Sequence, residues 1–125
     1  MPGVNDSGIS TFTAGAAIGQ YLRVKLTAGV LALAGITDRE LGTMEEASFA
    51  NGDVRAVRLR NKQGTRKMVA NAALAVGVDC FTAANGKVGA SASTAYREGV
   101  VLTASAADGD IIEVATDPDG GTVVP

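Results

Sequence analysis

Few residues of this chain have the side chains and the spacing that catalytic chemistry needs. The sequence contains no histidine, which removes Ser-His-Asp and Cys-His catalysis and the commonest metal ligand. Its single cysteine, Cys80, lies between Asp79 and Phe81 and is predicted to be a small core residue, not a reactive thiol. Gly86-Lys87 lacks the upstream glycine and the following Ser or Thr of a phosphate-binding P-loop.

Two aspartates occupy matching positions and could form a pair of catalytic carboxylates. Asp53 and Asp110 each follow a glycine after a run of small residues. Aspartate commonly caps turns by accepting hydrogen bonds from nearby backbone N–H groups, so the structural role is the stronger prediction. The Asp- and Gly-rich stretch 117–121 lacks the ligand series and the closing Glu of an EF-hand calcium loop. We therefore expect no catalytic residue, metal site or cofactor, and no enzymatic activity.

A cluster of basic side chains is a second candidate for binding a partner, beside the N-terminal arm described below. Six of them lie close together, just after an acidic stretch at 38–46: Arg55, Arg58, Arg60, Lys62, Arg66 and Lys67. A basic patch could bind nucleic acid, but this stretch has no aromatic residue for base stacking, and the net charge is −2. The other two interpretations are a solvated hairpin whose charges guard a sheet edge, and an ionic contact with a neighbouring subunit.

These residues are placed by a stretch of sequence that occurs twice. Residues 40–59 and 97–116 align at an offset of 57. The identical pairs are Gly42 and Gly99, Ala47 and Ala104, Ser48 and Ser105, Ala50 and Ala107, Gly52 and Gly109, Asp53 and Asp110, and Val57 and Val114. Each copy has the pattern of a strand, a turn closing on Gly-Asp and a second strand, which indicates an internal repeat.

The chain as a whole has the pattern of an all-β protein. Short strands recur every 8 to 12 residues or so, with Gly or Asn-Gly turns between them. We expect strands at 21–26, 30–33, 41–46, 54–60, 66–70, 78–82, 88–90, 97–103 and 110–116. The predicted fold is a small β-barrel or sandwich built from two related halves, with an extended N-terminal arm. The expected divisions are an arm at 1–15, one β domain at 16–116 with pseudo-repeats 16–59 and 72–116, and a tail at 117–125.

The N-terminal arm carries isolated apolar residues among Pro, Gly, Ser, Thr and Asn. Val4, Ile9 and Phe12 are too scattered for an amphipathic helix. They could anchor an extended segment on another chain, because an extended peptide can add to an exposed sheet edge. The alternative is a disordered terminus. No stretch reaches the roughly 18 to 20 apolar residues of a membrane span, and no signal peptide is evident, so we expect a soluble protein made in the cytosol.

The stretches 16–26, 72–78 and 96–114 resemble small capsid decoration (cement) proteins of tailed bacteriophages. Members of this family similarly place a Gly-Val strand, a run of small residues, Gly-Asp and a final Val-rich strand. The resemblance implies a β-rich protein, often a trimer, that sits on the outside of the head and bridges subunits of the major capsid protein. It also implies that the arm contacts the capsid. It carries over no catalytic residue.

The expected function is therefore to decorate and stabilise a phage capsid by binding the outer surface of its shell. The expected partners are the major capsid protein and sister subunits in a homotrimer, with no nucleic acid, membrane or small-molecule substrate. The protein would be made in the host cytoplasm and carried in the virion. The expected contact residues are Val4, Ile9, Phe12, Arg55, Arg58, Arg60, Arg66 and Lys67.

Two alternatives stay open. The first is a head-fibre base or a host-surface-binding β module of a virion. The second is a lipoyl- or biotinyl-type carrier domain, which also has two related β halves. Such a domain needs a modifiable lysine in a fixed motif at a central turn, and the residues that flank Lys62 do not match that motif.

Overall fold

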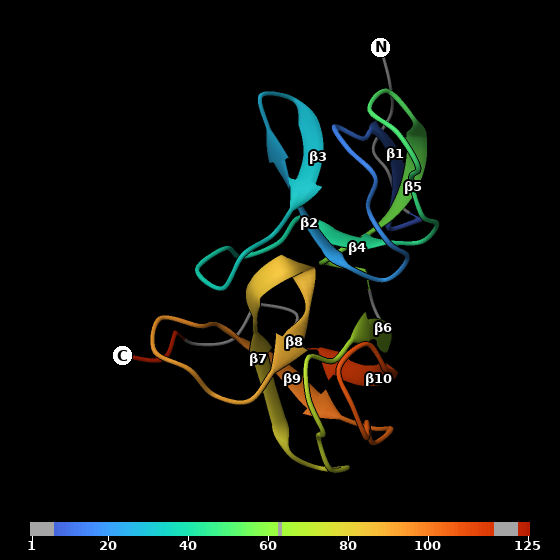
Figure 1. The fold of residues 1–125 in the computed structure, drawn as a ribbon. Coiled ribbons are helices and arrows are strands. Elements are labelled where there is room, and N and C mark those ends of the chain that lie inside the picture. Colours follow the sequence, from blue (N-terminus) through green and yellow to red (C-terminus); the bar gives the residue numbers. More distant parts are fainter. Residues whose placement is uncertain (1–6, 63, 117–122) are drawn as a thin grey trace.

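The computed structural model describes residues 7–62, 64–116 and 123–125, and within these ranges its regular elements are β-strands and one 3-10 turn. The strands form two halves, which lie one above the other in Figure 1: β1–β5 above and β6–β10 below. The predicted all-β class built from two halves is confirmed. Among the residues described, no helix is long and apolar enough to cross a membrane.

The first half is a five-stranded antiparallel sheet in the order β1-β5-β4-β2-β3. Its strands are β1 (Ile9–Thr13), β2 (Arg23–Thr27), β3 (Val30–Leu33), β4 (Gly42–Met44) and β5 (Val54–Leu59). The tight turn between β2 and β3 is made by Ala28 and Gly29, both with positive φ, as this kind of hairpin requires. A parallel bridge between Ala14 and Leu31 joins the two ends of the sheet, so the sheet curls towards closure.

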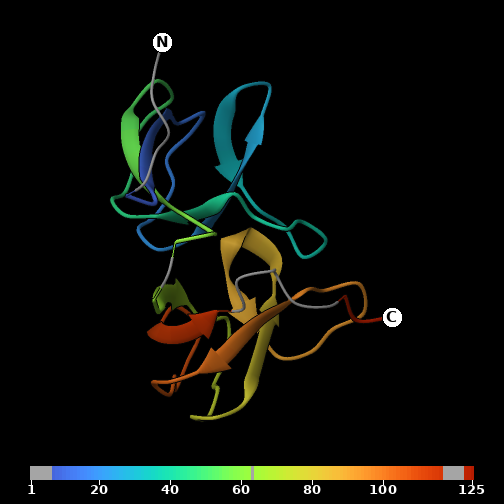
Figure 2. The same ribbon diagram turned by 180° about the vertical axis from the view of Figure 1, so that it is seen from behind.

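The second half has the same strand order, β6-β10-β9-β7-β8. Its elements are β6 (Arg66–Val69), β7 (Asp79–Thr82), the 3-10 turn η1 (Ala84–Gly86), β8 (Val88–Gly89), β9 (Arg97–Val101) and β10 (Ile111–Thr116). A parallel bridge between Ala70 and Val88 takes the place of the Ala14–Leu31 bridge. Figure 2 shows from behind that the two sheets remain separate bodies joined at one junction.

The Gly-Asp turns are built alike in the two halves. Asp53 Oδ2 accepts hydrogen bonds from the backbone N–H groups of Phe49 and Ala50, at 2.8 and 3.1 Å. Asp110 Oδ2 does the same with Ala106 and Ala107, at 2.8 and 3.0 Å. In both cases these bonds lower the pKa of the carboxyl group. Each aspartate is therefore the cap of its own turn, in a different half, which is the structural role that the sequence favoured.

The apolar side chains form one cluster in each half rather than a single shared core. The first cluster contains Ala14, Ile18, Val24, Leu31, Met44 and Val57. The second contains Met68, Ala70, Leu74, Cys80, Val88, Val101, Ile112 and Val114. Alternation along each strand sends these residues to the inner side of the curled sheet. Because both apolar clusters lie inside their own halves, polar side chains can occupy the surface where the two halves meet.

The first described residues of the chain differ from the expected arm. Residues Ile9–Thr13 are strand β1, which pairs antiparallel with β5 of the same chain. Phe12 packs against the first apolar cluster, and Ala14 is a buried member of it. The reason is that β5 offers an edge to which the segment adds, so the predicted strand addition occurs within the chain. The domain thus begins before residue 16.

The C-terminal tail is tied to the second half at its described residues. Val123 forms a bridge with Tyr96, and the backbone of Val124 exchanges hydrogen bonds with Thr94 and Ala95 at 2.8 Å each. Residues 117–122 of the predicted tail lie outside the described part of the chain.

The basic stretch is not the hairpin that the sequence suggested. β5 pairs with β1 and β4, whereas β6 pairs with β10 in the other sheet. The residues that follow β5 therefore carry the chain from the first half to the second. Basic side chains around this crossover come to lie where the two halves meet.

Candidate functional site

Arg66, the first basic residue after the crossover, is buried between the two halves. Its side chain is buried, and the whole residue is only 2 % exposed. Nη2 donates to the carbonyl of Leu59 at 3.0 Å, and Nη1 lies 3.9 Å from a carboxylate oxygen of Glu40. Arg66, which was predicted to contact a partner, is instead buried inside this chain, because β6 begins directly against the first half.

Three more basic residues of the predicted set also lie at the junction. Arg60 Nε is 3.8 Å from the Glu40 carboxylate. Arg58 Nη2 donates to the carbonyl of Thr65, in the other half, at 2.9 Å. Lys67 is exposed, and its Nζ lies 5.5 Å from the centre of the Tyr21 ring, also across the junction. Arg58 and Lys67 therefore connect the two halves, and Arg60 faces the carboxylate of Glu40.

The rest of the predicted contact residues lie away from the junction. Arg55 donates from Nε to Ala47 O and from Nη1 to Val54 O, at 2.8 and 2.9 Å, and so braces the β4–β5 connection. Ile9 is 37 % exposed on β1, whereas Phe12 is partly buried in the first half. Val4 lies outside the described residues.

Arg23 on β2 is the centre of the junction, and no feature of its local sequence marked it. The residue is completely buried, and its guanidinium donates to four backbone carbonyl groups. The acceptors are Gly35 and Asp38 in the first half and Ala83 and Lys87 in the second, at 2.7–3.2 Å. Its Nη1 is also 3.4 Å from Glu40 Oε1. One side chain thus holds both halves through directional bonds.

Glu40 and Glu98 bring two carboxyl groups together in the same buried region. Glu40 lies in the loop before β4 and Glu98 lies on β9, and their side chains are hydrogen-bonded to each other. The residues are 3 % and 4 % exposed. Burial alone would raise the pKa of Glu40, but the bond to Glu98 and the charges of Arg23 and Arg66 lower it. Burial and Glu40 together raise the pKa of Glu98 to about 9.

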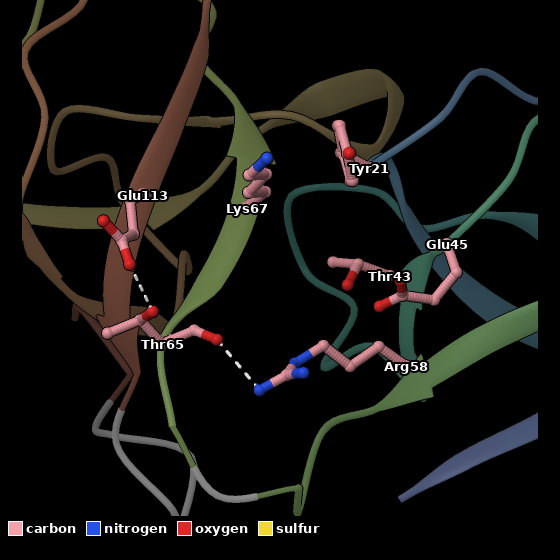
Figure 3. A pocket seen from close by; sticks show the side chains of 7 residues that line it. All are labelled: Tyr21, Thr43, Glu45, Arg58, Thr65, Lys67 and Glu113. Atoms are coloured by element: carbon pink, nitrogen blue, oxygen red, sulfur yellow. Dashed lines mark hydrogen bonds between the residues drawn. The ribbon is translucent and has the colours of Figure 1, made fainter.

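A polar cleft of about 250 Å³ lies beside this buried cluster. Figure 3 shows Tyr21, Thr43, Glu45 and Arg58 of the first half facing Thr65, Lys67 and Glu113 of the second. The Thr65 hydroxyl donates to the Glu113 carboxylate. Each wall carries one acidic and one basic side chain, so the cleft has no net preference for an anion or a cation. Tyr21 holds a positive φ of 67°, which is unusual for a residue with a side chain.

The described residues offer little for metal or thiol chemistry. In the ranges that the structure covers, no group of three or more Cys, Asp and Glu side chains could hold a metal ion. Burial raises the pKa of the Cys80 thiol to about 12, so at neutral pH it stays protonated and unreactive. Cys80 belongs to the second apolar cluster, as the sequence predicted.

Sequence reasoning missed Arg23, Glu40 and Glu98 as functional residues. The alternation in 21–26 placed Arg23 on the polar side of its strand, which is correct, but a strand pattern does not show that a second layer covers that side. One signal was available. At the matching positions of the other copy, Arg23 is replaced by Asp79 and Glu98 by Leu41. Such differences between copies mark places where the two halves have different surroundings.

Comparison with known proteins adds one similarity. No protein-family model matches the chain, and no curated protein matches its sequence. Among solved structures, the chain is similar to the head fiber gp8.5 N base in bacteriophage phi29, with a TM-score of 0.71 and 15 % sequence identity. The match covers 91 % of this chain and 98 % of that chain. This chain therefore shares the fold of that head-fibre base over nearly its whole described length.

Proposed function

We propose that this chain is a non-enzymatic structural protein of a phage virion, attached to the outer surface of the head. The observation that carries the proposal is the fold similarity to a phage head-fibre base, which extends over 98 % of that chain. The resemblance of the stretches 16–26, 72–78 and 96–114 to capsid decoration proteins supports the same location independently.

Two forms of attachment fit this proposal. A decoration protein occupies many equivalent positions on the shell and stabilises it by engaging several capsid subunits at once, each through a modest contact. In the second form, as a fibre base, the chain would anchor a longer appendage and occupy fewer positions. The fold similarity favours the fibre base, because it covers almost all of that structure. In either form we propose a homotrimer as the attached species.

The test is electron cryomicroscopy of heads of the phage that encodes this chain, mixed with the purified protein. Density outside the shell supports the proposal, and its copy number separates the two forms: high and regular for decoration, low for a fibre base. Sedimentation of the free protein measures its oligomeric state. The absence of added density at saturating protein concentration would overturn the proposed attachment.

The best-placed apolar anchor for the head is Phe49, in the connection between β4 and β5. It is 77 % exposed, and the guanidinium of Arg55 lies 5.9 Å from its ring. Exposed aromatic and arginine side chains are the usual anchors of protein interfaces. The second half has Ala106 at the matching position, so the anchor exists in one half only.

Replacing this anchor tests its role. We expect Phe49→Ser to weaken binding to heads about tenfold or more, which is the usual effect of losing an interface anchor. The melting temperature should stay unchanged, because the ring is outside both apolar clusters. Ile111→Ser is the matched control, since Ile111 is 54 % exposed on the other half. Co-sedimentation with heads measures both variants, and equal binding by Phe49→Ser and the unmodified chain would remove Phe49 from the contact.

A further inference from the structure

The junction between the two halves contains a pair of buried carboxyl groups. Glu40 and Glu98 come from different halves, are almost fully buried and are hydrogen-bonded through their side chains. Two ionised carboxylates have only acceptor oxygens, so a bond between them requires a proton on one of the two. The contact between the halves is therefore linked to a single proton.

Charged or titratable groups from several elements face this pair. From the first half these are Arg23 on β2, Arg60 after β5 and, through its effect on Arg66, Arg58 on β5. From the second half they are Arg66 on β6 and Cys80 on β7. All three close guanidinium groups approach Glu40, at 3.4, 3.8 and 3.9 Å. Glu40 is thus the natural anion of the pair, and Glu98 the natural acid.

The arginines do not remove the need for the shared proton. Among the described residues, the ion pairs that Arg23, Arg60 and Arg66 form with this pair within 4.0 Å all go to Glu40, and none goes to Glu98. Arg23 and Arg60 do oppose the effect of burial on Glu98, but burial, the bond to Glu40 and the charge of Glu40 prevail, and the pKa of Glu98 rises to about 9.

We propose that Glu40 and Glu98 share one proton as a latch between the two halves, and that alkaline solution loosens the junction by removing this proton. Two buried carboxylates in contact repel each other, and neither can then donate to the other. This repulsion destabilises the contact between the two halves and leaves both apolar clusters unaffected, because each cluster is formed within one half. The latch is a property of the fold that is separate from attachment to a head.

The sign of the pH dependence follows from the folded and unfolded pKa values of Glu98. Its ordinary value is 4.5 and its folded value is about 9, so between these limits the folded chain holds a proton that the unfolded chain has lost. Stability is then greatest at the acidic end of this window and falls as the pH rises through it. The lowered pKa of Glu40 acts in the opposite direction, and only below its ordinary value of 4.5. The sequence has no histidine to titrate in between.

Urea unfolding of the full chain between pH 5.5 and 8 tests the latch. We expect the folding equilibrium constant to fall by up to about tenfold per pH unit, the limit for one proton. Glu98→Gln should abolish this slope, because the amide keeps a donor to Glu40 and does not titrate. Glu113→Gln, on the neighbouring β10, is the control that should keep the slope. A flat profile for the unmodified chain, or an unchanged slope in Glu98→Gln, would overturn the proposal.

Two further measurements do not depend on the folding of Glu98→Gln. Carbon-13 NMR of the glutamate carboxyl groups in the unmodified chain should show one group titrating near pH 9, and titration of every glutamate below pH 6 would overturn the latch.

Hydrogen exchange should locate the loosening. Above pH 9 we expect protection of the Gly86 amide to fall, because it bonds across the junction to Ala34 O at 2.8 Å. The Gly109 amide, bonded to Ala70 O within the second half, should keep its protection. Equal behaviour of the two amides would contradict a local latch.

Discussion

Replacing Arg23 with alanine should destabilise the fold by about 3–5 kcal/mol, the usual cost of removing one partner from a buried ionic network. The substitution leaves four backbone carbonyls at the junction without their donor and removes the guanidinium closest to Glu40. Urea unfolding at pH 7 measures the loss.

Arg97→Ala is the matched control for this prediction. Arg97 pairs with Asp79, the residue that occupies the position matching Arg23, and both side chains are partly exposed. We expect a much smaller loss there, because solvent replaces the partner of an exposed pair. If Arg23→Ala proves no more harmful than Arg97→Ala, the junction does not depend on the buried guanidinium. Loss of protection at Gly86 before Gly109 would show further that the damage begins between the halves.

Gly99→Ala should destabilise the second half by about 3 kcal/mol, at the upper end of the usual cost of overpacking. A Cβ atom at Gly99 would collide with the carbonyl oxygen of Ala115 on β10, and would lie 2.8 Å from its carbonyl carbon and 2.9 Å from Thr116 Cα. These are backbone atoms, so relief requires β9 and β10 to separate rather than a side chain to rotate. Thermal or urea unfolding measures the effect.

The matching glycine of the first half gives a second test of the same geometry. A Cβ atom at Gly42 would meet the carbonyl group of Arg58 on β5, with the carbonyl carbon at 2.9 Å. We expect a similar loss for Gly42→Ala. Gly19→Ala is the control, because its Cβ would meet only the end of the Leu22 side chain, at 3.2 Å. A mild effect of both Gly42→Ala and Gly99→Ala would mean that the strands tolerate separation.

Several elements were predictable because they depend on neighbours in the sequence. Strands β2 to β10 all lie within two residues of their predicted bounds. The Asp53 and Asp110 turns formed as expected, since each aspartate caps backbone N–H groups only three and four residues away. The aligned stretches 40–59 and 97–116 also pointed correctly to two halves with matching strands.

Strand β1 was missed for a physical reason. Its sequence, Ile-Ser-Thr-Phe-Thr, has too few apolar residues to indicate burial by itself. What holds it is pairing with β5, which lies about 45 residues further along the chain. Residues 12–14 align with residues 68–70, just before the aligned apolar residues Ile18 and Leu74. Because 66–70 was predicted to be a strand, this alignment would have indicated a strand at 12–14 as well.

The sequence by itself determined the all-β class, the two halves and the turns that close each sheet, because alternation and turn chemistry are local. Only the tertiary structure decided what the charged residues do. Arg23 finds acceptors 60 and 64 residues away, and Arg66 is turned inward by the packing of one half on the other. A strand pattern separates two faces of a sheet, but it does not say which polar face a second layer will cover. Four of the basic residues that were predicted to bind another molecule lie where the two halves of the chain meet: Arg58, Arg60, Arg66 and Lys67.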